Sequence, residues 1–212
     1  MSSYLNKCLE LHNQGQDIKS IIENIYINYS SSEDNDKIYE YKKIISQQFN
    51  VSLKDIKLIG SAHTKFSKKS GSLEDRNDPN DYDFAIINTS LFNNYWSILN
   101  NDETEVSKTV YKNDLFYDNL KKGKIHPYHL NNNGRIYRNI KERLSELNSQ
   151  KKKKSSICIY AFEDAFINNL CEYLTSDLAQ YFKDKLKEPK IKKLASNGFR
   201  PLEDLGEKLN GK

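Results

Sequence analysis

The segment that most constrains the fold is Tyr82–Ile87, a largely apolar run preceded by Asp81. The run is too short for a typical helix and has the composition of a buried β-strand. It ends at Asn88, and Thr89 or Ser90 can cap a helix that begins there. The apolar positions of that helix recur at helical spacing and are Leu91, Phe92, Tyr95, Trp96 and Leu99.

Two further short runs have strand character, and helical patterns surround them. Ile56–Gly60 and Ile157–Ala161 predict strands, and a polar loop is predicted over Ser67–Asn80. Apolar residues at helical spacing predict two short helices, or one broken at Gly15, within 4–29, and further helices at 33–49, 112–121, 134–148 and 163–187. This order of elements predicts an α/β (α+β) fold with a small mixed sheet flanked by helices.

The length of 212 residues leaves little room for two full domains. The pattern instead predicts three regions along the chain. Residues 1–50 form an N-terminal helical segment, and residues 51–187 form a domain built on the sheet. Residues 188–212 carry few apolar anchors and are predicted to form a loosely held tail.

Composition excludes several classes of protein. Aromatic residues make up 11% of the chain, which argues against disorder. No stretch approaches the roughly 20 apolar residues that span a bilayer. The cysteines Cys8, Cys158 and Cys171 are odd in number and lack a C-x-x-C pair, so neither a disulfide framework nor a zinc knuckle is predicted. We therefore expect a cytoplasmic protein that does not act at a membrane.

Asp81 and Asp83 are the residues that point most directly to chemistry. Side chains two residues apart on a strand project from the same face, so these carboxylates lie together while Tyr82 and Phe84 point to the opposite face. Two neighbouring carboxylates repel each other unless a cation neutralises them. Mg²⁺ suits such a pair, because it is held by one or two carboxylates together with water and substrate phosphates. The sequence therefore predicts a Mg²⁺ site at this pair.

A second motif, Gly60-Ser61, follows the first predicted strand. Glycine lets the backbone approach a ligand closely, so the backbone N–H groups and the serine hydroxyl can contact a phosphate. The loop that follows adds Lys65, Lys68 and Lys69. A phosphate-binding turn one strand away from a metal-binding pair is the arrangement that metal-assisted phosphoryl or nucleotidyl transfer requires.

Together the two motifs resemble the nucleotidyltransferase superfold of DNA polymerase beta, whose members share a G-S loop and a D-x-D strand. The wider pattern, Gly-Ser-Ala-x-x-x-Phe-Ser and then Asp-x-Asp-Phe-Ala-Ile-Ile, is similar to small stand-alone bacterial nucleotidyltransferase-like proteins, several of them from toxin or phage-defence settings. The resemblance covers about residues 55–165. It implies that Gly60 and Ser61 hold a nucleoside triphosphate and that Asp81 and Asp83 bind Mg²⁺.

The superfold also places a third carboxylate on the next central strand, and the predicted strand Ile157–Ala161 contains no acid. Glu163 and Asp164 come just after that strand, and Glu105 lies in a segment of ambiguous pattern. We favour Asp164 and expect one of its carboxylate oxygens within about 6 Å of the D-x-D pair, close enough to share a metal ion. Without such an acid, the chain would bind a nucleotide or a partner and not catalyse transfer.

Two functions therefore follow from the sequence. The first is a Mg²⁺-dependent nucleotidyltransferase whose acceptor is an RNA end, a protein side chain or a small molecule. The residues assigned to it are Asp81, Asp83 and Asp164 for catalysis, with Gly60, Ser61 and Lys65 for nucleotide binding. The second function is a catalytically degenerate binding module that acts with a protein partner as an antitoxin, a sensor or a partner subunit.

The remaining polar motifs have plainer explanations. Ser61 and His63 lie two residues apart in a turn, which is poor geometry for a nucleophile and its general base. His126 and His129 have no third metal ligand near them in the sequence. Lys151–Lys154 is typical of a solvated linker, although such a run can also neutralise the phosphates of a nucleic acid.

Overall fold

The computed structural model describes residues 4–30, 35–69, 72–76, 79–106, 110–150 and 153–187. Within them the fold is mixed α/β, as the sequence predicts. The helices are α1 (Leu5–Asn13), α2 (Ile18–Glu23), α3 (Asn35–Phe49), α4 (Gly60–Thr64), α5 (Thr89–Asn101), α6 (Val110–Lys121), α7 (Arg135–Gln150) and α8 (Glu163–Lys187). The strands are β1 (Ile56–Ile59), β2 (Phe66–Lys69), β3 (Ser72–Asp75), β4 (Asp81–Ile87), β5 (Lys124–Ile125) and β6 (Lys154–Tyr160).

The central sheet has the strand order β1-β4-β6-β5 and is mixed. β4 pairs antiparallel with β1 and parallel with β6, and β5 pairs antiparallel with β6. The register places Asp83 between Ile59 on one side and Ser156 on the other. Lys124 lies beside Tyr160, at the opposite end of β6. The D-x-D strand is therefore an interior strand with a neighbour on each side.

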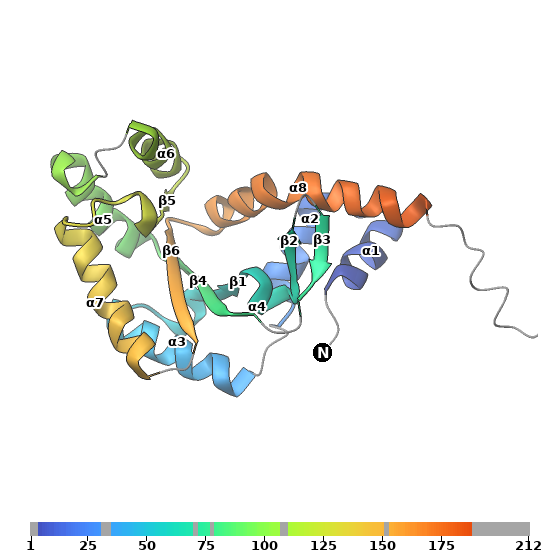
Figure 1. Ribbon diagram of the computed structural model, residues 1–212, viewed down its shortest axis with the longest axis horizontal. Coiled ribbons are helices and arrows are strands. Elements are labelled where there is room, and N and C mark those ends of the chain that lie inside the picture. The colour runs from blue at the N-terminus through green and yellow to red at the C-terminus, as the bar shows by residue number, and fades with distance from the viewer. Residues whose placement is uncertain are drawn as a thin grey trace, which may run out of the picture.

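Alternation along β4 assigns its side chains to two separate cores. Tyr82, Phe84 and Ile86 are fully buried in a core that also contains residues of α3, α5, α6 and α7. Ala85 lies in a second core with residues of α1, α2 and α8. Figure 1 shows the sheet between these two groups of helices. Asp81 and Asp83 have the same parity as Ala85, so they belong to the α8 side of the sheet, opposite Tyr82 and Phe84 as predicted.

The predicted loop over 67–80 is wrong for most of its described residues. β2 and β3 pair antiparallel as a two-stranded sheet, with Phe66 opposite Asp75 and Lys68 opposite Leu73. Phe66 and Leu73 are both buried in the core beneath α8. Burial of these two apolar residues offsets the weak strand propensity of the lysines and serines around them.

The third predicted strand begins earlier than expected. β6 begins at Lys154, three residues before the predicted start at Ile157. The added residues are polar, but they pair in register with Asp81–Asp83 of β4. Hydrogen bonding to β4 extends the strand into sequence that has no strand pattern of its own.

The longer helices lie close to their predicted positions, whereas the short α4, which begins at Gly60, was not predicted. Gly15, with a φ of +84°, lies between α1 and α2, which confirms the break in the first predicted helix. Asn88 caps α5, in place of the predicted Thr89 or Ser90, and its side chain accepts a hydrogen bond from the backbone N–H of Leu91 at 2.9 Å. The predicted tail, 188–212, lies outside the described residues. Among those residues, no helix combines the length and the apolar character needed to cross a membrane.

Candidate functional site

The G-S turn, which is Gly60-Ser61 at the start of α4, lies beside the D-x-D strand β4. Ile59 is the register partner of Asp83, so Gly60 follows directly beside this carboxylate. Gly60 has a φ of +64°, a conformation that glycine adopts readily and that other residues rarely adopt. A Cβ atom at Gly60 would lie 3.3 Å from Asp83 Oδ2. A side chain at this position would therefore crowd the carboxylate, and glycine leaves that space open.

Asp83 is held by its neighbour on β6. The Ser156 hydroxyl donates a hydrogen bond to Asp83 Oδ1 at 2.5 Å. Burial raises the pKa of Asp83 above 3.8, the hydrogen bond from Ser156 opposes this rise, and the charge of Asp81 adds to it. Asp81 itself is exposed at the first position of β4. The pair therefore carries a repulsion that a bound cation would relieve.

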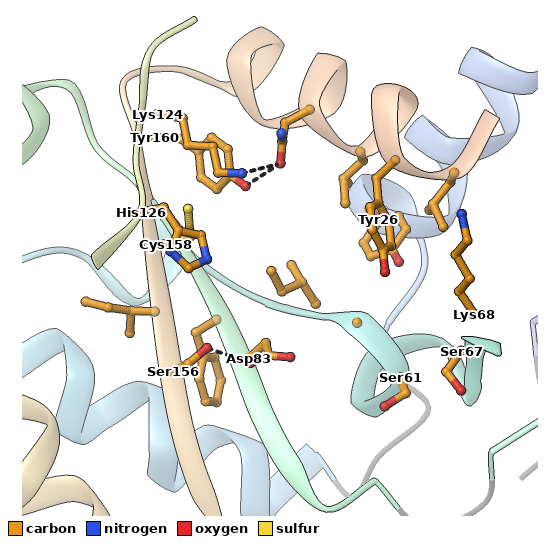
Figure 2. Close-up of a pocket in the computed structure, with 18 of the residues that line it drawn as sticks. Tyr26, Ser61, Ser67, Lys68, Asp83, Lys124, His126, Ser156, Cys158 and Tyr160 are labelled. Atoms are coloured by element: carbon orange, nitrogen blue, oxygen red, sulfur yellow. Dashed lines mark hydrogen bonds between the residues drawn. The ribbon is translucent and has the colours of Figure 1, made fainter. Parts of the chain in front are cut away.

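A cleft of about 500 Å³ opens on this face of the sheet. Figure 2 shows β4 and β6 on one side of it, the β2–β3 hairpin on the other, and α8 above. Gly60, Ser61 and Asp83 line one end of the cleft, and its volume is within the range of small-molecule sites. The cationic side chains that line it are Lys68, Arg76 and Lys124.

Arg76 is a site residue that the sequence pattern did not reveal. It follows β3 directly, and its backbone N–H donates to the carbonyl of Lys65 at 2.8 Å, which continues the pairing of β2 with β3 by one residue. No carboxylate of the described chain forms an ion pair with its guanidinium. Nothing in the local sequence marks Arg76 as a site residue, because the hairpin that positions it was predicted as a loop. The guanidinium is therefore available for an anion in the cleft.

The lysines of the predicted phosphate loop have different surroundings. Lys68 lines the cleft and forms an ion pair with the buried carboxylate of Asp177 on α8, with 2.9 Å between Nζ and Oδ2. Lys65 is 7% exposed, follows α4 in a left-handed conformation and does not line the cleft. The side chain of Lys69 lies outside the described residues. The structure thus brings Lys68 to the site and does not bring Lys65 there.

Asp164 is separated from the D-x-D pair. Asp83 is level with Ser156, and β6 then runs to Tyr160, a distance along the strand of about 13 Å at a rise of about 3.3 Å per residue. Asp164 follows beyond that end, exposed in the first turn of α8 with Glu163. The assignment of Asp164 as the third carboxylate is therefore corrected: as a first-turn acid it complements the dipole of α8.

Glu105 has a structural role. It is buried, and its two carboxylate oxygens accept hydrogen bonds from the backbone N–H groups of Arg135 at 2.9 Å and Ile136 at 2.7 Å. These groups begin α7, so Glu105 caps that helix from outside its own segment. A Cβ atom at Gly134 would lie 2.7 Å from Glu105 Oε2, which explains the glycine before the helix.

The residues of β6 that lie beside Asp81 and Asp83 are not carboxylates. Lys154 and Ser156 are the register partners of Asp81 and Asp83. Among the described residues, no group of three or more histidine, cysteine, aspartate or glutamate side chains is arranged to hold a metal ion. Two carboxylates on one strand still fit Mg²⁺ when phosphate oxygens and water complete its coordination. The donor set therefore suits a metal that arrives with a phosphorylated ligand.

The two histidines His63 and His126 differ in their surroundings. His63 is buried, and its Nε2 lies 2.6 Å from the carbonyl oxygen of Ile25, so it belongs to the packing of the N-terminal helices. Burial lowers the pKa of His63 to about 4. His126 lines the cleft. The sequence patterns Ser61-x-His63 and His126-x-x-His129 therefore mark neither a catalytic dyad nor a metal centre in the described chain.

Comparison of the chain with protein-family models, with curated proteins and with solved structures finds no match. The functional argument therefore depends on the geometry of the cleft.

Proposed function

We propose that the chain binds a nucleoside triphosphate together with Mg²⁺ in this cleft, as a nucleotidyltransferase-like binding module. The observation that carries the proposal is the position of Gly60 beside the Asp83 carboxylate, where a Cβ atom would lie 3.3 Å from Oδ2, in a cleft lined by cations. A phosphate that approaches Gly60 and Ser61 would lie next to the acid pair. Its negative charge requires a cation between them, and Mg²⁺ supplies that charge and accepts phosphate oxygens as ligands.

Each side chain has a defined task in this proposal. Asp83 and Asp81 would hold the cation, and the hydrogen bond from Ser156 fixes Asp83 so that its other oxygen faces Gly60. Ser61 and Arg76 would donate hydrogen bonds to the phosphate oxygens, because both line the cleft and Arg76 forms no ion pair within the described chain. Lys68 adds positive potential from the hairpin while it stays paired with Asp177.

The residues near the acid pair favour nucleotide binding over nucleotidyl transfer. Transfer needs a base within hydrogen-bond reach of the acceptor hydroxyl and, in the superfold, a third carboxylate. Lys154 and Ser156 occupy the neighbouring positions on β6, Asp164 lies at the far end of that strand, and Glu105 caps α7. A sensor, an antitoxin or a partner subunit that responds to nucleotide needs none of these catalytic groups.

The three cysteines are free thiols, which supports the reducing cytoplasm as the location.

The test is a calorimetric titration of the protein with each nucleoside triphosphate, with and without Mg²⁺. We expect saturable binding of at least one nucleotide, weakened about tenfold or more, that is by about 1.4 kcal/mol, when Mg²⁺ is removed or in Asp83→Asn. Asp164→Asn is the matched control, because it removes the same charge from an exposed site away from the cleft. Equal loss in both variants, or no saturable binding, would contradict the proposal.

A second arm separates binding from transfer. The protein is incubated with Mg²⁺, cell extract and nucleotide that is radiolabelled at the α-phosphate. We expect the label to stay in the free nucleotide. Covalent label on RNA, protein or a small molecule, absent with Asp83→Asn, would instead support the transferase.

A further inference from the structure

The cleft has a second polar end that the proposed function does not use. It lies where β6 ends and β5 begins, with Tyr160 beside Lys124 in the sheet and Asn169 on α8. Along β6 this end is about 13 Å from Ser156 at about 3.3 Å per residue. A nucleotide whose phosphates lie at Asp83 can place its base at this distance.

Asn169 is held in one orientation by two donors. Its Oδ1 accepts hydrogen bonds from Lys124 Nζ at 3.1 Å and from the Tyr160 hydroxyl at 2.9 Å, and Figure 2 shows both meeting on one atom. Lysine can only donate, so the oxygen of the amide must be the atom that faces it. Asn169 Nδ2 therefore points away from this pair with two N–H groups, and no acceptor of the described chain bonds to them.

His126 adds another donor. Its Nδ1 accepts a hydrogen bond from the backbone N–H of Tyr128 at 3.1 Å, so the ring proton lies on Nε2. Burial, together with the charge of Lys124, lowers the pKa of His126 to about 4, which keeps the ring neutral at pH 7. His126 lines the cleft next to Cys158, as Figure 2 shows.

This end of the cleft is therefore rich in N–H donors. Beyond the hydrogen bonds named above, Lys124 retains two N–H groups, Asn169 two and His126 one, and all three residues line the cleft. The Tyr160 phenol oxygen can accept a hydrogen bond, but the donors outnumber it. The chemistry suits a ligand edge that carries adjacent acceptors.

We propose that this end of the cleft recognises the O6 and N7 edge of a 6-oxopurine, so that the preferred nucleotide is guanosine triphosphate. The inference rests on the proposed function and specifies its ligand. Guanine presents two adjacent acceptors on that edge, and paired donors such as a lysine are its usual partners. Adenine presents an amino group in place of O6, which would face N–H groups without an acceptor. Cytosine has an amino donor there, and uracil has a single carbonyl.

The first experiment needs no variant. Calorimetry in Mg²⁺ compares the triphosphates of guanosine, inosine, 7-deazaguanosine and adenosine. Inosine shares O6 and N7 with guanine but lacks its 2-amino group, so we expect the inosine and guanosine nucleotides to bind equally. The 7-deaza nucleotide should bind several-fold more weakly, because N7 is replaced by carbon. The adenosine nucleotide should bind about tenfold or more weakly.

The second experiment assigns the preference to Asn169. Asn169→Asp keeps an oxygen for Lys124 and Tyr160 but replaces the two N–H groups by an acceptor. We expect the guanosine-to-adenosine affinity ratio to fall about tenfold, toward one. Asn168→Asp, at the exposed neighbouring position, adds the same charge and should leave the ratio unchanged. Thermal melting of both variants verifies that they are folded.

The outcomes separate the two proposals. Mg²⁺-dependent binding that Asp83→Asn abolishes but that is equal for guanosine and adenosine triphosphate would overturn the base preference and leave the proposed function standing. A guanosine preference that Asn169→Asp and Asn168→Asp change equally would also overturn it. Absence of any nucleotide binding would overturn both.

Discussion

The two faces of the central sheet are made by the same strands, yet one is closed and the other is open. On one face Tyr82, Phe84 and Ile86 are fully buried beneath helices. On the other face Ala85 is buried, but two residues earlier Asp83 is half-buried against Ser156 and the cleft. The closed face stabilises the strand, so the open face can hold groups that repel each other. Stability and ligand binding should therefore respond to different substitutions on neighbouring residues.

The largest effect is expected on the closed face. Phe84→Ala removes a fully buried ring and should lower the free energy of unfolding by about 3–5 kcal/mol. Ser156→Ala, on the open face of the adjacent strand, should change it by less than about 1 kcal/mol, because water can replace its hydrogen bond. Urea unfolding measures both. Similar losses would mean that the two faces contribute equally to stability.

The second-largest loss of stability is expected when the cap on α7 is removed. Glu105→Ala leaves two backbone N–H groups at the start of α7 without their carboxylate and should cost about 1–3 kcal/mol. Its nucleotide affinity, by calorimetry, should equal that of the wild type, since the cap is remote from the cleft lining. Glu103→Ala, an exposed acid of the same segment, is the control and should have little effect. A variant that loses nucleotide binding while folded would assign Glu105 to the site.

At the G-S turn, strain and binding can be separated. Gly60→Val and Gly15→Val both place a side chain on a backbone of positive φ, which should cost each about 1–2 kcal/mol of stability. The Cβ at Gly60 meets Asp83, whereas the Cβ at Gly15 meets nothing within 4 Å. Only Gly60→Val should also lose Mg²⁺-nucleotide binding in calorimetry. If it binds normally, the turn does not contact the phosphates.

The smallest effect concerns pH. The folded state holds the pKa of Asp83 above 3.8, so ionisation of this group disfavours folding. The resulting loss of stability is absent below about pH 3.8 and grows as pH rises through the folded-state pKa of Asp83. Without Mg²⁺, Asp83→Asn should therefore match the wild type in stability at low pH and equal or exceed it at pH 7, as urea unfolding across this range can measure. A variant that is less stable only at pH 7 would show that the ionised carboxylate stabilises the fold.

The parts of the fold that local pattern encodes were predictable. Apolar runs identified β1 and β4, and helical spacing identified α3, α7 and α8. The Gly60-Ser61 and Asp81-x-Asp83 motifs were found because each adjoins an apolar run, although the register that brings Gly60 beside Asp83 was not predicted. These features depend on local sequence, because the spacing of the apolar residues indicates which face of an element is buried.

What could not be predicted depends on pairing between distant segments. Ser156 entered the site only because β6 continues into polar sequence alongside β4. Arg76 entered it because β2 and β3 pair, which places the residue after β3 beside Lys65. Asp164 was misplaced because sequence alone does not say which end of a parallel strand lies near the acids. Lys124 and Asn169 lie far apart in the chain and meet only across β5 and α8.

The ion pair between Lys68 and Asp177 limits how the cleft can move. Asp177 is 6% exposed, so a hairpin that swung away from α8 would leave a carboxylate buried without its counter-ion. Lys68 is 39% exposed, so water screens this pair and it contributes less than a fully buried one. The pair therefore favours the position in which the hairpin lies against α8 and closes one side of the cleft.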